Sequence, residues 1–86
     1  MSDASIYSQI NTLRQAAHDE YTAKEGREQF PLAPLDGSDW TEDSTYGRTL
    51  GDPETDYSVT ITGDTVTIYA AGVDVSTAEI AGAGEL

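Results

Sequence analysis

The sequence contains no cysteine, which excludes disulfide bonds and thiolate zinc sites. Its single histidine, His18, has no second histidine to join it as a metal ligand. Lysine and arginine are scarce, with four in 86 residues, so no basic patch is available to neutralise nucleic-acid phosphates. We therefore expect no direct binding of nucleic acid, and a fold held by apolar packing or by another chain.

Long hydrophobic runs are also missing. No stretch approaches the roughly 18 apolar residues of a membrane span, so we expect no membrane contact. The N-terminal run MSDASIYSQI has neither a basic n-region nor a hydrophobic h-region. On this basis we expect that the protein is not secreted through a signal peptide.

Acidic residues dominate the charge. Sixteen Asp and Glu stand against four Lys and Arg, which gives a formal net charge of −12. Such self-repulsion opposes a compact state in dilute buffer but is largely screened in molar salt, where the Debye length is about 3 Å. Lys24 is the only lysine, while threonine, alanine and aspartate are abundant. Without an adaptation to salt, the same composition would indicate an acidic protein of a non-halophilic organism or a disordered acidic tail, and the patterned hydrophobic residues argue against the disordered tail.

This composition resembles that of proteins from halophilic archaea and from the viruses that infect them. The resemblance is one of class and involves no family motif. It implies a small structural protein of a haloarchaeal tailed virus, located in the virion or in the cytoplasm of a halophilic host.

Residues 5–24 have the pattern of one amphipathic helix. Ser5 and its neighbours are good N-cap residues, and Gly26 offers a natural stop. The apolar residues recur at spacings of four, three and four, as a buried helical stripe requires: Ile6, Ile10, Leu13 and Ala17.

Residues 57–70 have the alternation of a β-hairpin with a two-residue turn, Gly63-Asp64. Glycine in the first turn position favours type II′ geometry. Folding there opposes Ile61 to Val66 on one face and Thr60 to Thr67 on the other. We expect a possible third strand at 73–76 and a weakly held tail at 77–86.

Residues 26–56 lack a clear period and contain three prolines, so the sequence predicts a long irregular loop. The whole chain, 1–86, is then one small α+β domain: a helix, this loop, and a two- to three-stranded antiparallel sheet. The apolar residues counted in these elements are few for ordering 86 residues. This shortage predicts that other chains hold the loop and both ends.

No motif indicates catalysis or a bound cofactor, so we expect a non-enzyme without cofactors. His18, Asp19 and Glu20 are consecutive, and consecutive helical residues point in different directions. One acidic cluster is a weak candidate for Ca²⁺ binding, although its spacing is not that of an EF-hand. Its members are Asp36, Asp39, Glu42 and Asp43.

The function favoured by these features is a structural or assembly subunit that binds neighbouring protein chains, identical or different, most of all in a capsid or tail. Aromatic and apolar loop residues and one hairpin face supply the candidate contacts, since a short hairpin offers an edge for strand addition. The candidate interface residues are Phe30, Leu32, Leu35, Trp40, Tyr46, Thr60, Thr67 and Tyr69.

The alternative is a free-standing acidic regulator or adaptor of a halophilic archaeon. In one form it would mimic DNA, with carboxylates spaced like phosphates along one helix face. The residues available for this are Asp19, Glu20, Glu25 and Glu28.

Overall fold

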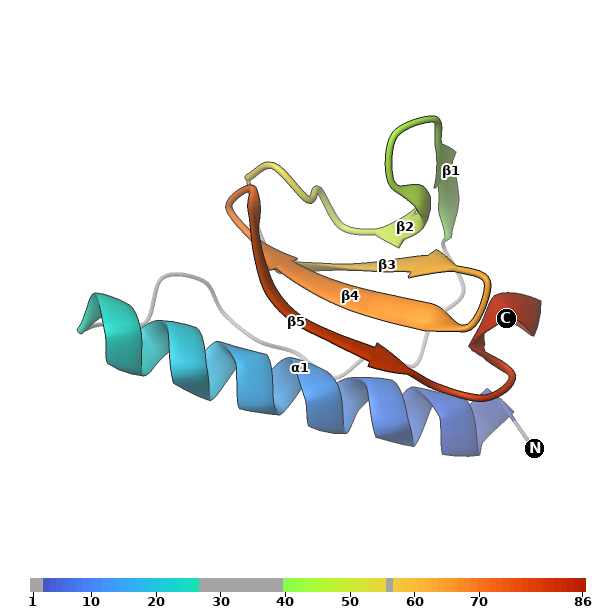
Figure 1. Ribbon diagram of the computed structural model, residues 1–86, viewed down its shortest axis with the longest axis horizontal. Helices are drawn as coiled ribbons and strands as arrows, with labels where there is room; N and C mark the ends of the chain where they lie inside the picture. The colour runs from blue at the N-terminus through green and yellow to red at the C-terminus, as the bar shows by residue number, and fades with distance from the viewer. Residues whose placement is uncertain (1–2, 27–39, 56) are drawn as a thin grey trace.

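The computed structural model describes residues 3–26, 40–55 and 57–86. In this part of the chain one helix packs against a five-stranded antiparallel sheet whose strands follow one another in sequence order (Figure 1). The elements are α1 (Asp3–Glu25), β1 (Thr41–Asp43), β2 (Gly47–Leu50), β3 (Tyr57–Thr62), β4 (Thr65–Ala70), β5 (Val73–Glu79) and the 3₁₀ helix η1 (Ala83–Glu85). The α+β class is confirmed, but the expectation of two or three strands is wrong.

The predicted helix is present and slightly longer than expected, at Asp3–Glu25. Ile6, Ile10 and Ala17 on its apolar stripe are buried. Gly26 ends it with a φ of 77°, and its N–H donates to the carbonyl of Thr22 at 2.9 Å. Only glycine adopts this left-handed conformation without strain, which is why the helix stops there.

The predicted hairpin is confirmed in its register. Ile61 pairs with Val66, and Thr60 pairs with Thr67. At the turn, Gly63 has a φ of 59° and the following Asp64 does not have a positive φ. A positive φ at the first turn position alone is the mark of type II′ rather than type I′.

Strands β1 and β2 lie inside the segment predicted as an irregular loop, and this is where the strand count was wrong. Asp43 and Gly47 close a three-residue hairpin loop. The Oδ1 atom of Asp43 accepts the N–H groups of Thr45 at 2.7 Å and Tyr46 at 3.0 Å. Gly47 has a φ of 83°, and a Cβ there would lie 2.9 Å from the carbonyl oxygen of Ile61. Glycine is therefore required both by the turn and by the neighbouring strand.

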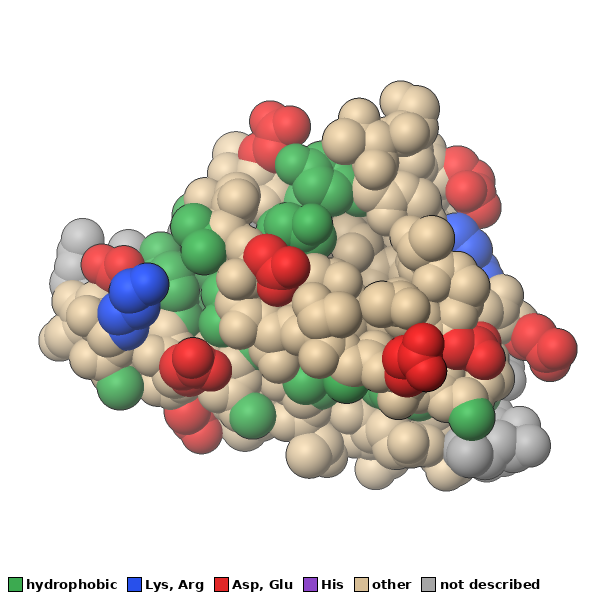
Figure 2. Space-filling view, in the orientation of Figure 1, with side chains coloured by type: hydrophobic (Ala, Val, Ile, Leu, Met, Phe, Trp, Pro, Cys, Tyr) green, Lys and Arg blue, Asp and Glu red, His purple; other side chains and the backbone are tan. Residues whose placement is uncertain are grey.

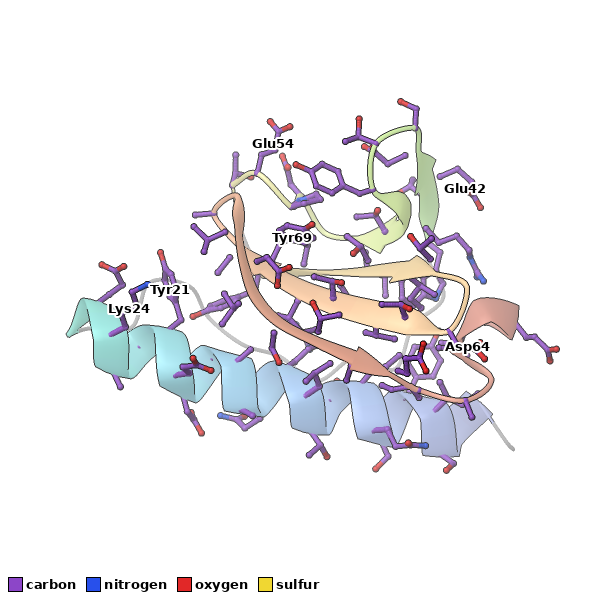
Figure 3. The ribbon with its side chains drawn as sticks, in the orientation of Figure 1. Tyr21, Lys24, Glu42, Glu54, Asp64 and Tyr69 are labelled. Carbon is purple, nitrogen blue, oxygen red and sulfur yellow. The ribbon has the colours of Figure 1, made fainter. Side chains whose placement is uncertain are left out.

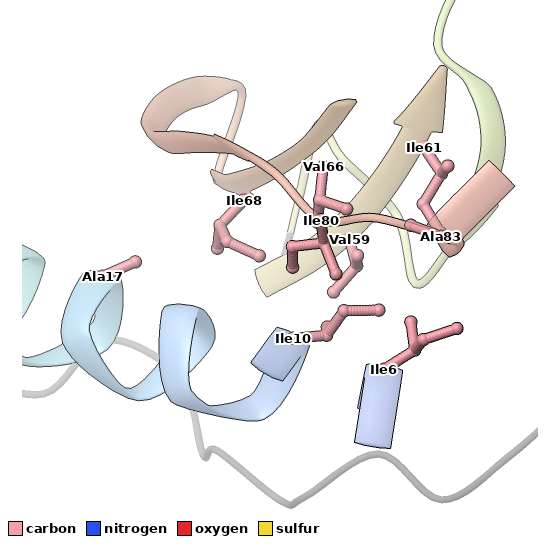
Figure 4. Packing of buried hydrophobic residues seen from close by; sticks show 9 residues of the cluster. All are labelled: Ile6, Ile10, Ala17, Val59, Ile61, Val66, Ile68, Ile80 and Ala83. Carbon is pink, nitrogen blue, oxygen red and sulfur yellow. The ribbon is translucent and has the colours of Figure 1, made fainter. Parts of the chain in front are cut away.

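The core lies between α1 and one face of the sheet (Figure 4). It is built from aliphatic residues of the helix, the two central strands and the C-terminal segment: Ile6, Ile10, Ala17, Val59, Ile61, Val66, Ile68, Ile80 and Ala83. Four partly buried residues pack against it: Leu13, Trp40, Val75 and Leu86. A core of this extent exceeds the one that the helix and hairpin patterns supply by themselves.

The C-terminal segment contributes to this core. β5 runs on to Glu79, past the expected end at residue 76. The carbonyl of Asp64 then accepts the N–H of Ile80 at 2.9 Å, and its Oδ1 accepts the N–H of Gly84 at 2.9 Å. Ile80 and Ala83 are buried. The tail is thus fastened to the hairpin turn within the chain, which reduces the shortage of core that the sequence predicts.

Candidate protein-interaction site

The sheet face opposite α1 carries a row of threonines, one from each strand. The register places them side by side in this order: Thr41, Thr49, Thr60, Thr67 and Thr77. Thr49 and Thr60 are only 3% and 5% exposed, whereas Thr77 is exposed. Of the two hydroxyls predicted at an interface, Thr60 is therefore buried and Thr67 half-buried.

In residues 3–26, 40–55 and 57–86, β5 forms one edge of the sheet, because β4 is its only neighbour in the strand order. Among the described residues no strand pairs with its outer edge. The register slips between Ile68 and Tyr69, which pair with Ser76 and Asp74, so Val75 is an extra, bulged residue. A seven-residue edge presents a row of backbone donors and acceptors to which another strand could add.

Val73 stands out on this edge. It is 48% exposed, and no other large hydrophobic side chain in the described part of the chain is exposed to this extent. A single exposed valine would need no explanation. Here, however, the valine borders a hollow. Figure 2 shows hydrophobic side chains gathered on the left of the view, where α1 ends and β5 begins in Figure 1, with carboxylates among them.

The hollow lies between the last turns of α1 and β5 and has a volume of about 80 Å³. Figure 3 shows Tyr21 and Lys24 projecting from α1 on the side of the sheet. The lining of the hollow combines apolar, aromatic and charged residues: Glu20, Tyr21, Lys24, Val73, Asp74 and Val75. We call these six residues together with the outer edge of β5 the edge site. The space is large enough for one side chain of an incoming strand and too small for a typical small-molecule ligand.

An aromatic pair adjoins the edge site on the opposite face of the sheet from α1. The rings of Tyr46 and Tyr69 meet edge to face, with centroids 5.2 Å apart. Tyr69 lies directly across from Asp74 of β5, which joins the pair to the edge site. Burial and the charge of Glu54 raise the pKa of Tyr46 above its usual value, so the surroundings of the Tyr46 hydroxyl disfavour a further negative charge.

Trp40 has contacts within the fold. Its Nε1 donates to the hydroxyl of Tyr7 at 2.9 Å, and the guanidinium of Arg48 lies 5.5 Å from the ring centroid. The indole is partly buried and packs against the core, so it fastens β1 to α1. Its role at an interface stays a prediction. The other aromatic and leucine candidates, Phe30, Leu32 and Leu35, lie outside the described residues.

His18 belongs to a second aromatic cluster. Its ring centroid is 5.5 Å from that of Tyr57, and Tyr21 meets the same ring edge to face at 6.0 Å. The Nδ1 atom of His18 lies 3.3 Å from Oδ1 of Asp19. This cluster joins the second half of α1 to the start of β3, and it places Tyr21 at the edge site.

The predicted acidic cluster is only partly within the described residues. Asp36 and Asp39 lie outside them, while Glu42 and Asp43 are exposed on β1. Across residues 3–26, 40–55 and 57–86 no group of three or more His, Asp or Glu side chains is arranged to hold a metal ion.

The carboxylates considered for DNA mimicry are exposed on α1 where they are described, and Glu28 lies outside. Asp19 is occupied in part by a hydrogen bond from Gln15 at 3.0 Å. Asp19 and Glu20 are consecutive and therefore point in different directions, and Glu25 lies five residues beyond Glu20. The described helix is also too polar to meet the requirements of a membrane-spanning segment.

No protein-family model, no curated protein and no solved structure matches this chain. The assignment of the site therefore depends on the geometry of the edge site and of the aromatic pair.

Proposed function

We propose that this chain is a non-catalytic subunit that binds neighbouring protein chains, and that a strand of a neighbour pairs with the outer edge of β5. The observation that carries the proposal is the edge itself: seven residues with no strand on their outer side among the described residues, next to an exposed Val73 and a hollow. Strand addition supplies affinity through main-chain hydrogen bonds and specificity through alternate side chains.

The edge site has the side chains that such a contact uses. Tyr21 is half-buried and lines the hollow beside Val73 and Val75, so an apolar side chain of the partner would be desolvated there. Tyrosine is enriched at the energetically dominant positions of interfaces because it combines a large apolar area with a polar tip. The aromatic pair, Tyr46 and Tyr69, extends this surface beyond the edge.

For the assembly itself, we propose a virus particle of a salt-loving archaeal host, with the chain as a capsid or tail component. The composition supports this: the net charge is −12 and only one lysine is present. A chain of this charge is most stable where salt screens its self-repulsion.

The proposal is tested by sedimentation of the tagged chain in an extract of the cells that produce it or of the particles that contain it. The wild type should migrate in a complex far larger than 9.2 kDa. Val73→Asp should release it, because a carboxylate in the apolar part of the edge site is costly to bury.

The matched control is Ala16→Asp, which introduces the same group at an exposed position of α1. Circular dichroism of both variants establishes that they fold. A wild type that sediments as a lone chain would remove the proposal, as would Val73→Asp remaining in the complex.

A further inference from the structure

We infer that the strand received by β5 is cationic, with lysine or arginine at two positions four residues apart on one face, and that β5 rejects a second copy of its own chain. This inference rests on the proposed function. It adds the chemistry of the partner, and it follows from the placement of two carboxylates on β5.

Asp74 and Glu79 lie on the same face of the sheet. They pair with Tyr69 and Thr65 of β4, and both carboxylates are exposed. They are five residues apart along β5, but their β4 partners are only four apart, because Val75 is bulged. A regular strand on the other side of β5 would match them with residues i and i+4, which share a face because the pleat has a period of two.

A second copy of β5 would place like charges together. Residues directly opposite one another in an antiparallel pair share a face of the sheet. The symmetric antiparallel register that sets Asp74 opposite the copy's Glu79 therefore brings their carboxylates together, because the two residues lie on one face of β5. Symmetry repeats this contact, and each chain adds a net charge of −12. Like charges at such positions are destabilising, so the edge is protected against self-pairing.

A cation beside Asp74 has further favourable contacts. Tyr69 lies directly across from Asp74, and its ring meets that of Tyr46. A guanidinium over a tyrosine face and near a carboxylate gains from both.

The test uses synthetic strand peptides and the full chain, followed by amide chemical shifts in ¹⁵N–¹H NMR spectra. The first peptide has seven residues, with lysine at its second and sixth positions and alternating threonine and valine elsewhere. The second has glutamate at those two positions. The third has its lysines at the second and fifth positions, which lie on opposite faces.

The lysine peptide should shift the amides of β5 and bind about 4- to 25-fold more tightly than the glutamate peptide, from about two- to five-fold for each exposed ion pair. The third peptide should bind with intermediate affinity. Asp74→Asn with Glu79→Gln keeps the shape of the edge and should abolish the preference. Asp74→Lys with Glu79→Lys should invert it. Raising the salt from about 0.1 to about 1 M, where the Debye length falls from about 10 to about 3 Å, should weaken the preference.

Each contrary result has a separate meaning. Equal binding of the lysine and glutamate peptides would overturn this inference and leave strand addition in place. If neither peptide shifts the amide signals of β5, the proposed function itself is wrong. Dimerisation of the wild type, measured by sedimentation and lost in Thr77→Pro, would replace the cationic partner with a second copy.

Discussion

Replacing Gly84 by alanine would press a methyl group against the β3–β4 turn. An ideal Cβ at this position lies 2.6 Å from the carbonyl oxygen of Gly63 and 3.1 Å from Oδ1 of Asp64. The first distance is to backbone, so the clash is not relieved by a side-chain rotation. Gly84 does not have a positive φ, so the substitution adds no backbone strain and its effect is steric.

Two responses set the size of the effect. If the segment stays docked, overpacking costs about 1–3 kcal/mol. If it detaches, the chain loses the 2.9 Å hydrogen bond from Gly84 to Asp64 and the burial of Ala83, together about 2 kcal/mol. The cheaper response decides, so Gly84→Ala should lower the free energy of unfolding by about 1–2 kcal/mol. For a domain of this size that lowers Tm by about 4–16 °C.

Urea and thermal unfolding followed by far-UV circular dichroism would measure the change. Glu85→Ala is the matched control, since Glu85 is exposed in the same 3₁₀ segment and should alter stability by less than about 0.5 kcal/mol. Asp64→Ala combined with Gly84→Ala should cost less than the sum of the two, because both act on one contact. An unchanged midpoint for Gly84→Ala, with Gly84 exchanging its amide hydrogen as fast as an unstructured peptide, would refute the docking of the C-terminal segment.

Four further outcomes are expected. Ile10→Ala, at a fully buried position, should cost about 2–5 kcal/mol in urea unfolding, and a loss below 1 kcal/mol would contradict the core packing. Ala71→Asn should raise the free energy of unfolding by about 0.5–1 kcal/mol, because Ala71 has a φ of 50° that asparagine tolerates better; a lower Tm would count against this turn. Ultraviolet titration should place the pKa of Tyr46 above the usual value of about 10, with Glu54→Gln lowering it. As the pH rises, the Tyr46 phenol ionises first in the unfolded chain, whose pKa is about 10. The contribution of Tyr46 to stability is therefore complete below that unfolded-state pKa and is lost as the pH rises through the folded-state pKa. Raising NaCl from about 0.1 to about 1 M should raise Tm, because the self-repulsion of a chain with net charge −12 is screened; a falling Tm would contradict salt adaptation.

The helix and the central hairpin could be predicted because local pattern and tertiary role agree there. The stripe at Ile6, Ile10 and Ala17 faces the sheet, as its period requires. The hairpin register follows from alternation on two faces together with the Gly63-Asp64 turn. In the hairpin a register shift by one residue would move the apolar set to the other face, so the sequence admits one register.

β1 and β2 could not be recognised from alternation because they are only three and four residues long. Strands this short contain too few apolar residues to show a period. The usable signal was the turn: Asp43 followed by Gly47 matches a three-residue hairpin loop with glycine in the left-handed position. A search limited to two-residue turns misses this pattern.

The edge site was only partly accessible to sequence reasoning. The alternation of Val73, Asp74 and Val75 indicates a strand, but the predicted interface residues lie mainly on other segments. In a sheet whose strands follow sequence order, the last strand must be an edge, and that deduction needed the number and order of the strands. Tyr21 reaches the site from α1, which no local pattern could show.

The C-terminal packing also changes the reason for expecting a partner. Ile80 and Ala83 are buried within the chain, and residues 40–50 form paired strands, so a shortage of core no longer carries the argument alone. What remains is the edge of β5. A bulge and two carboxylates are the devices by which edge strands avoid pairing with copies of themselves, and the same carboxylates favour a strand of opposite charge. Specificity is a difference between two affinities, and on this edge one pair of side chains, Asp74 and Glu79, acts on both.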